Sequence, residues 1–206
     1  MKKLLLLGLL ASPLAANAVV LNANPAANNG TGGIFIDMTA GANDLSVFQI
    51  DTQFAGAVGL NVSVEVYTRP GTYVSFQASS AGWTLLGTMG AVAAGTTTST
   101  PIALSSTIDI AAGQTVGVYL HSITSGGGIR YFGTGTTSNT NFNDSDLSLF
   151  TAHARTGSVA FAGTMNTPRA LAGAVHYNVN PVPEPATMVA LGLGAVAVLR
   201  RRRAAK

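Results

Sequence analysis

The 206-residue chain contains no cysteine, and only 9% of its residues are charged. The absence of cysteine excludes thiolate catalysis and cysteine-ligated zinc sites. So few charges, together with 24 glycines and 47% hydrophobic residues, argue against a charged disordered tail and against an ordinary cytoplasmic helical enzyme.

Lysine is missing from the whole central part of the chain. Between Val19 and Asn180 there are four arginines against seven acidic residues, a net charge of −3, although the full chain carries +3. The positive surplus therefore belongs to the two ends, and the composition predicts no nucleic-acid partner for the body.

Catalytic signatures are also absent from the sequence. It has no HExxH, GxSxG, P-loop or dinucleotide fingerprint. His121, His153 and His176 lie far apart, and we interpret them as surface or strand-face residues. The alternative is a metal or Ser-His-Asp site, if the strands of His121 and His176 pair. We therefore expect no enzyme, with a secreted hydrolase using His121, His176 and Asp146 as the third choice of function.

The N-terminus has the three parts of a secretory signal peptide. Lys2 and Lys3 precede an apolar run at 4–11, and Ala16-Asn17-Ala18 places small residues where signal peptidase needs them. We predict a signal peptide at 1–18, cleaved after Ala18. The alternative is a buried amphipathic N-terminal helix.

The C-terminus combines a proline motif, an apolar run and a basic end. Pro183-Glu184-Pro185 precedes the uncharged run 186–199, which Arg200, Arg201, Arg202 and Arg203 follow. The run predicts a helix of about 21 Å, short against ~30 Å of hydrocarbon, so we expect a short transmembrane helix. The positive-inside rule keeps 200–206 in the cytoplasm and the body outside.

These features, in this order and with an N-terminal signal peptide, resemble the PEP-CTERM protein-sorting tail. The resemblance rests on Val182-Pro183-Glu184-Pro185-Ala186-Thr187, the short apolar helix and the arginine cluster. It implies a Gram-negative envelope and an exosortase, a membrane-embedded transpeptidase-like enzyme that processes the tail near Pro183-Glu184-Pro185. The family is associated with exopolysaccharide and with biofilm or floc matrix. The alternative is a plain single-pass anchor that is never processed.

The body is predicted to be all-β. In 60–67, Leu60, Val62, Val64 and Val66 alternate with polar or aromatic residues that face the other way. A type II turn at 68–71 then predicts a hairpin partner at 73–77. The other expected strands are 34–39, 45–54, 83–89, 102–104, 115–121, 129–132, 147–150, 158–161 and 171–179.

No helical period separates these segments, so we predict an antiparallel β-sandwich, jelly-roll-like, large enough to bury one core. The expected organisation is a signal peptide (1–18), a flexible leader (19–33), the β-sandwich domain (34–180) and the sorting tail (181–206). The body also resembles an uncharacterised domain of secreted bacterial proteins, on stretches 64–71, 82–87, 125–131 and 143–147.

One loop offers alternating side-chain oxygens of the kind that calcium prefers. Asn141, Asn143, Asp144 and Asp146 lie in the run 141–146, which lacks the glycine and distal glutamate of an EF-hand. We weigh calcium binding there against an Asx-type turn leading into the 147–150 strand. No other cofactor is predicted.

Aromatic residues supply candidates for a carbohydrate-binding surface. Tyr67 lies on the polar face of its strand, Tyr73 follows the predicted turn, and Trp83 precedes another strand. The alternative is that these rings stabilise the core or the hairpin.

These observations predict a secreted, non-enzymatic cell-surface or extracellular-matrix protein, associated with exopolysaccharide or biofilm. Its expected partners are signal peptidase, an exosortase-type enzyme, exopolysaccharide and further copies of itself, because lysine-free edges do not prevent self-association. We expect export, transient anchoring in the inner membrane, and then the cell surface or the exterior. A carbohydrate-binding module is the alternative function.

Overall fold

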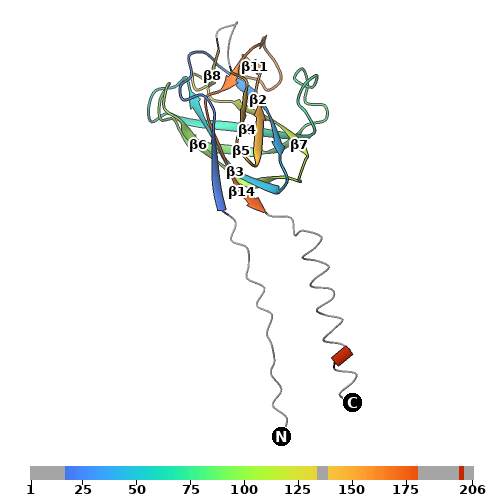
Figure 1. Ribbon diagram of the computed structural model, residues 1–206. Helices are drawn as coiled ribbons and strands as arrows, with labels where there is room; N and C mark the ends of the chain where they lie inside the picture. Colours follow the sequence, from blue (N-terminus) through green and yellow to red (C-terminus); the bar gives the residue numbers. More distant parts are fainter. Residues whose placement is uncertain (1–16, 134–138, 181–199, 202–206) are drawn as a thin grey trace.

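The computed structural model describes residues 17–133, 139–180 and 200–201, and within them the body is all-β with antiparallel sheets (Figure 1). This confirms the prediction of an all-β body with antiparallel sheets. The strands are β1 (Asn17–Asn22), β2 (Gly33–Ala40), β3 (Asp44–Phe54), β4 (Asn61–Pro70), β5 (Thr84–Val92), β6 (Thr100–Ile110), β7 (Thr115–Ser122), β8 (Ile129–Phe132), β9 (Asn141–Asn143), β10 (Leu147–Phe150), β11 (Ala154–Arg155), β12 (Met165–Asn166), β13 (Ala170–Leu171) and β14 (Gly173–Asn180).

The described strands form two sheets. The first has the order β1-β14-β3-β8-β13, with β6 also paired to β3. The second has the order β12-β11-β2-β7-β4-β5, with β10 paired to β2 and β9 paired to β10. Side chains from both sheets, among them Ile36 of β2 and Ile50 of β3, belong to one hydrophobic cluster, so the sheets enclose a common core.

Strand β4 shows how the sequence pattern becomes two different faces. Val62, Val64 and Val66 are buried in the common core. Glu65 lies between two of these valines and Tyr67 follows the last of them, and both are only partly buried on the opposite face. The predicted alternation along this strand is therefore confirmed. Because successive side chains of a strand point to opposite faces, Glu65 and Tyr67 lie on the outer face of the second sheet.

That outer face carries a second apolar cluster of its own. Phe35 of β2 and Tyr119 of β7 stack there with ring centroids 4.0 Å apart, and Tyr73 and Phe161 from two long loops cover them. Strand β2 is consequently buried on both faces. Gly33 makes room for this packing, because a Cβ atom there would lie 2.6 Å from the Tyr119 ring.

The predicted strands at 73–77 and 158–161 are wrong, because tertiary contacts hold both segments in loops. The Asp37 carboxylate accepts hydrogen bonds from the Thr72 hydroxyl and from the Tyr73 backbone N–H, which draws the chain across the sheet. At Phe161 the backbone is left-handed, with φ at 63°, and this conformation does not continue a strand. The short strands β9, β11 and β12 were not expected.

The leader expected to be flexible also differs from the structure. Asn17–Asn22 forms β1, which pairs along its whole length with β14. Leu21 is buried in the common core, and burying that side chain stabilises the pairing. The predicted cleavage position after Ala18 lies inside this strand, opposite Asn178.

Because β1 and β14 are paired, the two ends of the body lie side by side, as Figure 1 shows. The predicted transmembrane helix at 186–199 lies outside the described residues, as does most of the tail. In the part of the chain that the structure describes, no helix is long and apolar enough to span a membrane.

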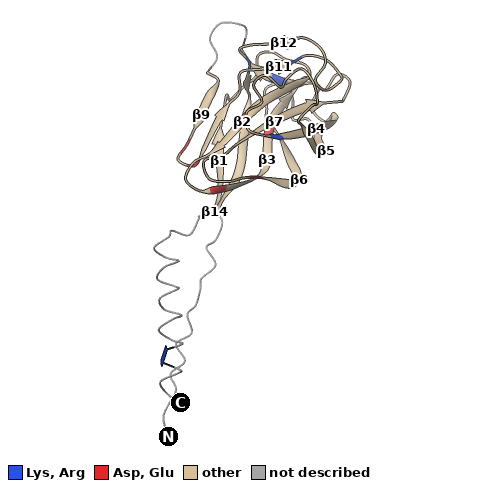
Figure 2. Cartoon of the chain, turned by 90° about the vertical axis from the view of Figure 1, so that its right-hand side faces the viewer, with Lys and Arg blue, Asp and Glu red and all other residues tan. Residues whose placement is uncertain are grey.

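Charged residues are sparse and unevenly placed on the body (Figure 2). Acidic residues gather near the end of β14: Asp44 is opposite Asn180, and the Asp144 carboxylate accepts a hydrogen bond from the Tyr177 hydroxyl. Arg155, in contrast, lies on β11, beside the loops that cover the outer face of the second sheet. The end of the body that leads into the tail is therefore acidic.

Candidate functional site

An open groove lies on the outer face of the second sheet. Its volume is about 690 Å³, and its walls are the segment 78–80 on one side and the segment 158–162 on the other. We call it the Glu65 groove, after the acidic residue that lines it. Its lining residues are Glu65, Tyr67, Ala78, Ser79, Ser80, Ile123, Ser158, Val159, Ala160, Phe161 and Ala162.

Strand pairing brings the polar centre of the groove together. Glu65 of β4 is directly opposite His121 of β7, and Tyr67 is directly opposite Tyr119. The Tyr67 hydroxyl donates a hydrogen bond of 2.9 Å to Oε2 of Glu65. His121 is buried behind them, 1% exposed, with Nδ1 3.6 Å from the same oxygen.

The hydrogen bonds of His121 determine which ring nitrogen carries the proton. Nε2 lies 3.2 Å from the carbonyl oxygen of Gly157, and a carbonyl only accepts, so Nε2 is the protonated nitrogen. The other ring nitrogen, Nδ1, faces Oε2 of the Glu65 carboxylate at 3.6 Å, beyond hydrogen-bond distance. Nδ1 is buried and has no hydrogen-bond partner among the described residues.

The pKa of Tyr67 reflects the nearby Glu65 carboxylate. Burial, together with the hydrogen bond and the negative charge of Glu65, raises the pKa of Tyr67 to about 12. Tyr67 therefore stays protonated at physiological pH and continues to donate to Oε2. Among the described residues no group donates a hydrogen bond to the other carboxylate oxygen, Oε1, so this oxygen can accept one from a ligand.

Arg155 ties the two walls of the groove to each other. Its Nε donates to the carbonyl oxygen of Gln77 at 2.7 Å, and its Nη1 donates to the carbonyl oxygen of Gly163 at 2.6 Å. These carbonyls adjoin the segments 78–80 and 158–162. The left-handed backbone at Phe161 in the second wall turns its ring toward Tyr67, with ring centroids 5.0 Å apart. Strained residues of this kind gather at functional sites.

The three aromatic residues predicted for a ligand surface have different positions. Tyr67 lines the groove. Tyr73 is fully buried, accepts a hydrogen bond from the Ala152 N–H and lies 3.0 Å from Nδ1 of His153, so its ring is not available to a ligand. Trp83 is half-buried against the second cluster, and its indole N–H donates to the carbonyl of Phe76.

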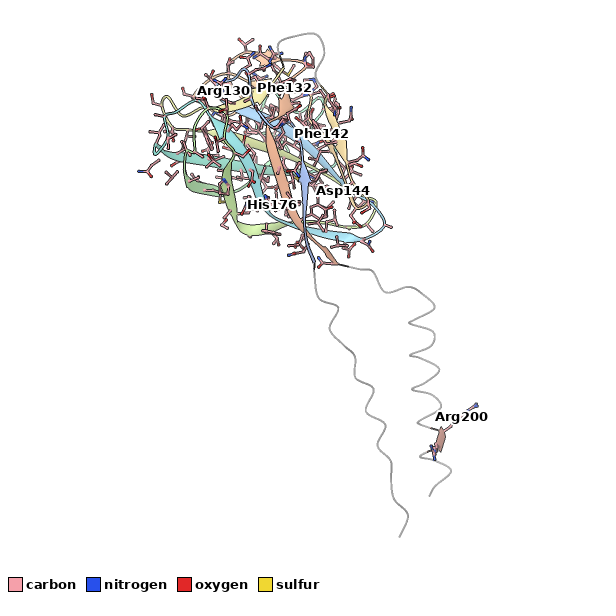
Figure 3. The ribbon with its side chains drawn as sticks, turned by 60° about the vertical axis from the view of Figure 1, so that its left-hand side comes forward. Arg130, Phe132, Phe142, Asp144, His176 and Arg200 are labelled. Atoms are coloured by element: carbon pink, nitrogen blue, oxygen red, sulfur yellow. The ribbon has the colours of Figure 1, made fainter. Side chains whose placement is uncertain are left out.

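The run predicted as a calcium loop is organised by hydrogen bonds within the protein. Oδ1 of Asp144 accepts the backbone N–H groups of Asp146 and Leu147, the arrangement of an Asx-type turn, and Oδ2 accepts the Tyr177 hydroxyl at 2.7 Å. Asp146 accepts from Asn43 and Ser145. Asn141 and Asn143 are exposed. Figure 3 shows Asp144 near the end of the body that leads into the tail.

The histidines named for a hydrolase do not meet. His121 lies on β7 in the second sheet, and His176 lies on β14 in the first, where its Nε2 is 2.9 Å from Asp51 (Figure 3). Asp146 belongs to the loop before β10. Residues 17–133, 139–180 and 200–201 contain no group of three His, Cys, Asp or Glu side chains able to hold a metal ion.

Sequence reasoning missed Glu65 and Arg155 as site residues and did not connect His121 with either. The signal for Glu65 was present, since it is an acid on the face of β4 opposite the valines. Nothing local marks Arg155, which acts through loop carbonyls that lie 78 and 8 residues away in sequence.

Most of the predicted sorting residues lie outside the described part of the chain. These are Ala16, Pro183, Glu184, Pro185, Arg202 and Arg203. Ala18 is exposed on β1, and Arg200 and Arg201 are exposed in a short helical segment.

Comparison with known protein families identifies the C-terminal segment. Residues 181–203 match the PEP-CTERM protein-sorting motif. This match confirms the predicted sorting tail and implies an exported protein that an exosortase-type enzyme sorts at the membrane. Among curated proteins, no sequence matches the chain.

Proposed function

We propose that this chain is a non-enzymatic β-sandwich protein of the cell surface or extracellular matrix, associated with exopolysaccharide or biofilm. The observation that carries the proposal is the sorting motif at 181–203, which begins directly after β14. Signal peptidase removes 1–18, the helix at 186–199 anchors the chain transiently in the inner membrane, and the exosortase releases the body near Pro183-Glu184-Pro185.

The placement of the ends of the body supports this route. Since β1 and β14 are paired, the chain preceding the body and the tail both leave from one end. A body held at the membrane through either segment therefore presents the same end to the bilayer. The Glu65 groove lies on the second sheet, whereas β1 and β14 belong to the first.

Cell fractionation of the full chain tests this proposal. Deleting 181–206, or the host exosortase, should move the body from the surface or matrix to another fraction. Replacing Pro183, Glu184 and Pro185 by alanine, with 186–206 intact, should leave an uncleaved and membrane-bound chain. Unchanged processing and location in all three cases would overturn the proposal.

A carbohydrate-binding module is the second candidate, and the Glu65 groove is the observation that favours it. The groove combines the Tyr67 ring with a carboxylate and the serines at 79, 80 and 158. Aromatic faces and polar groups of this kind suit sugars, whose rings are apolar on their faces and polar at their edges. A glycan array, with Tyr67→Ala as the matched variant, tests it: loss of all bound glycans in the variant is expected, and binding unchanged by it would exclude the groove.

Self-association would suit a matrix role. Strand β5 is a sheet edge without a charged residue, and it exposes Leu85 and Val92 by 48% and 58%. Uncharged edges of this length favour pairing with another chain. Light scattering of the purified body should show assembly that grows with concentration and decreases with Leu85→Lys. A monomer at all concentrations would contradict self-association.

A further inference from the structure

We infer that the Glu65 groove selects an amine-bearing sugar unit, whose ammonium group binds the Glu65 carboxylate. This inference rests on the proposed carbohydrate-binding role of the groove and specifies the class of glycan. It follows from the charges around the groove, from the hydrogen bonds that Glu65 lacks, and from the position of the Tyr67 ring.

Glu65 is the single ionised residue among those that line the groove. The nearest cationic side chain of the walls is Arg155, and its recorded hydrogen bonds go to the carbonyls of Gln77 and Gly163. Within the described part of the chain, the Tyr67 hydroxyl is the one hydrogen-bond donor to the carboxylate. Among the described residues no Lys or Arg is paired with Glu65, so a cationic ligand can meet this carboxylate.

His121 lies behind the carboxylate and donates no hydrogen bond to it. Its Nε2 proton is directed to the Gly157 carbonyl, and its Nδ1 lies 3.6 Å from Oε2 of Glu65, beyond hydrogen-bond distance. An ammonium group can therefore approach the carboxylate from the groove, whereas an acidic sugar would be repelled by it.

The groove also provides a place for the sugar ring next to the carboxylate. Tyr67 is partly exposed, and its own hydroxyl holds Glu65 on the same face of β4. An aromatic face attracts both the C–H side of a sugar and a nearby cation. The serines of the two walls offer hydroxyls for the remaining polar groups of the ligand.

Isothermal titration of the purified body with three sets of oligosaccharides tests the inference. The probes are glucosamine oligomers, N-acetylglucosamine oligomers of the same length and oligomers of an acidic sugar, in a buffer in which the free amines are protonated. We expect glucosamine oligomers to bind at least about tenfold more tightly than the acetylated ones, the effect of one charge-assisted hydrogen bond. Added salt should reduce this difference.

Glu65→Gln keeps the shape of the side chain and an acceptor for Tyr67, and it should abolish the preference. Asp109→Asn removes one negative charge from a hydrogen bond with Ser46 outside the groove and should leave the preference intact. Circular dichroism of both variants checks that they fold. Equal binding of amine and acetylated oligomers, or tighter binding of the acidic ones, would overturn the inference and leave the groove a glycan site. No binding of any probe or arrayed glycan would overturn both proposals.

Discussion

The Asp144 turn and the Glu65 groove each place a carboxylate at the surface of the body, but with opposite hydrogen bonding. Asp144 accepts three hydrogen bonds from its own chain, which engage both of its oxygens. Among the described residues Glu65 accepts one, from Tyr67, and its Oε2 lies 3.6 Å from Nδ1 of His121. A carboxylate whose oxygens are satisfied stabilises the fold, whereas one left open in a groove is available to a ligand.

The largest expected effect is on stability, when Asp144 is replaced. Asp144→Ala leaves the buried Tyr177 hydroxyl and two backbone N–H groups without their acceptor. We expect a loss of about 2–4 kcal/mol in the free energy of unfolding, measured in urea. Asp146→Ala is the control, with an expected loss under about 1 kcal/mol. Equal losses would show that the hydrogen bonds of Asp144 contribute no more to stability than those of Asp146.

A smaller effect is expected from loosening the walls of the groove. Arg155→Ala removes the two hydrogen bonds to loop carbonyls. We expect a loss of about 1–3 kcal/mol and faster amide hydrogen exchange in 76–80 and 158–163, with the β1–β14 ladder unchanged. Arg155→Lys should recover part of the protection. Unchanged exchange in both segments would show that Arg155 does not hold the walls.

The pH dependence of stability provides a third test, at Asp37 of β2. Burial raises the pKa of Asp37, and this effect exceeds the lowering by the hydrogen bonds from Thr72 and Tyr73 and by the nearby Arg69 and His153. Because the folded-state pKa is the higher one, the contribution of protonated Asp37 to stability is complete below the ordinary aspartate pKa of 3.8 and is lost as pH rises through the folded-state value.

Asp37→Asn stays neutral at every pH and keeps one acceptor oxygen. Relative to this variant, the wild type should lose stability as pH rises from about 4 toward neutrality. Melting temperatures of both proteins across this range measure the difference. A constant difference between the two would mean that Asp37 does not titrate with a raised pKa.

The smallest expected effect concerns calcium at the Asp144 turn. The carboxylate oxygens of Asp144 and Asp146, the charged ligands that calcium would need, already accept hydrogen bonds within the protein. We therefore expect EGTA to leave the melting temperature unchanged in calcium-containing buffer. A clear decrease would restore the calcium hypothesis for Asn141, Asn143, Asp144 and Asp146.

Local pattern predicted much of the fold and little of the candidate site. The alternation in 60–67 correctly indicated β4 and its two faces, and the apolar segment 147–150 coincides with β10. The segments 73–77 and 158–161 have strand-like composition, but Asp37 and the second cluster hold them as loops. Tyr67 lies on the polar face of β4 as the alternation predicted, whereas Tyr73 is buried in the second cluster, which no local pattern indicated.

By itself, the sequence determined that the protein carries a sorting motif for export and that its body is all-β. A sorting motif is read as a contiguous segment, and strand alternation repeats every two residues, so both are local properties. The tertiary structure alone decided which carboxylate is open. Pairing of β4 with β7 places Glu65 against His121, and Arg155 joins loops far apart in the chain, because partners in a sheet are set by register and not by distance along the sequence.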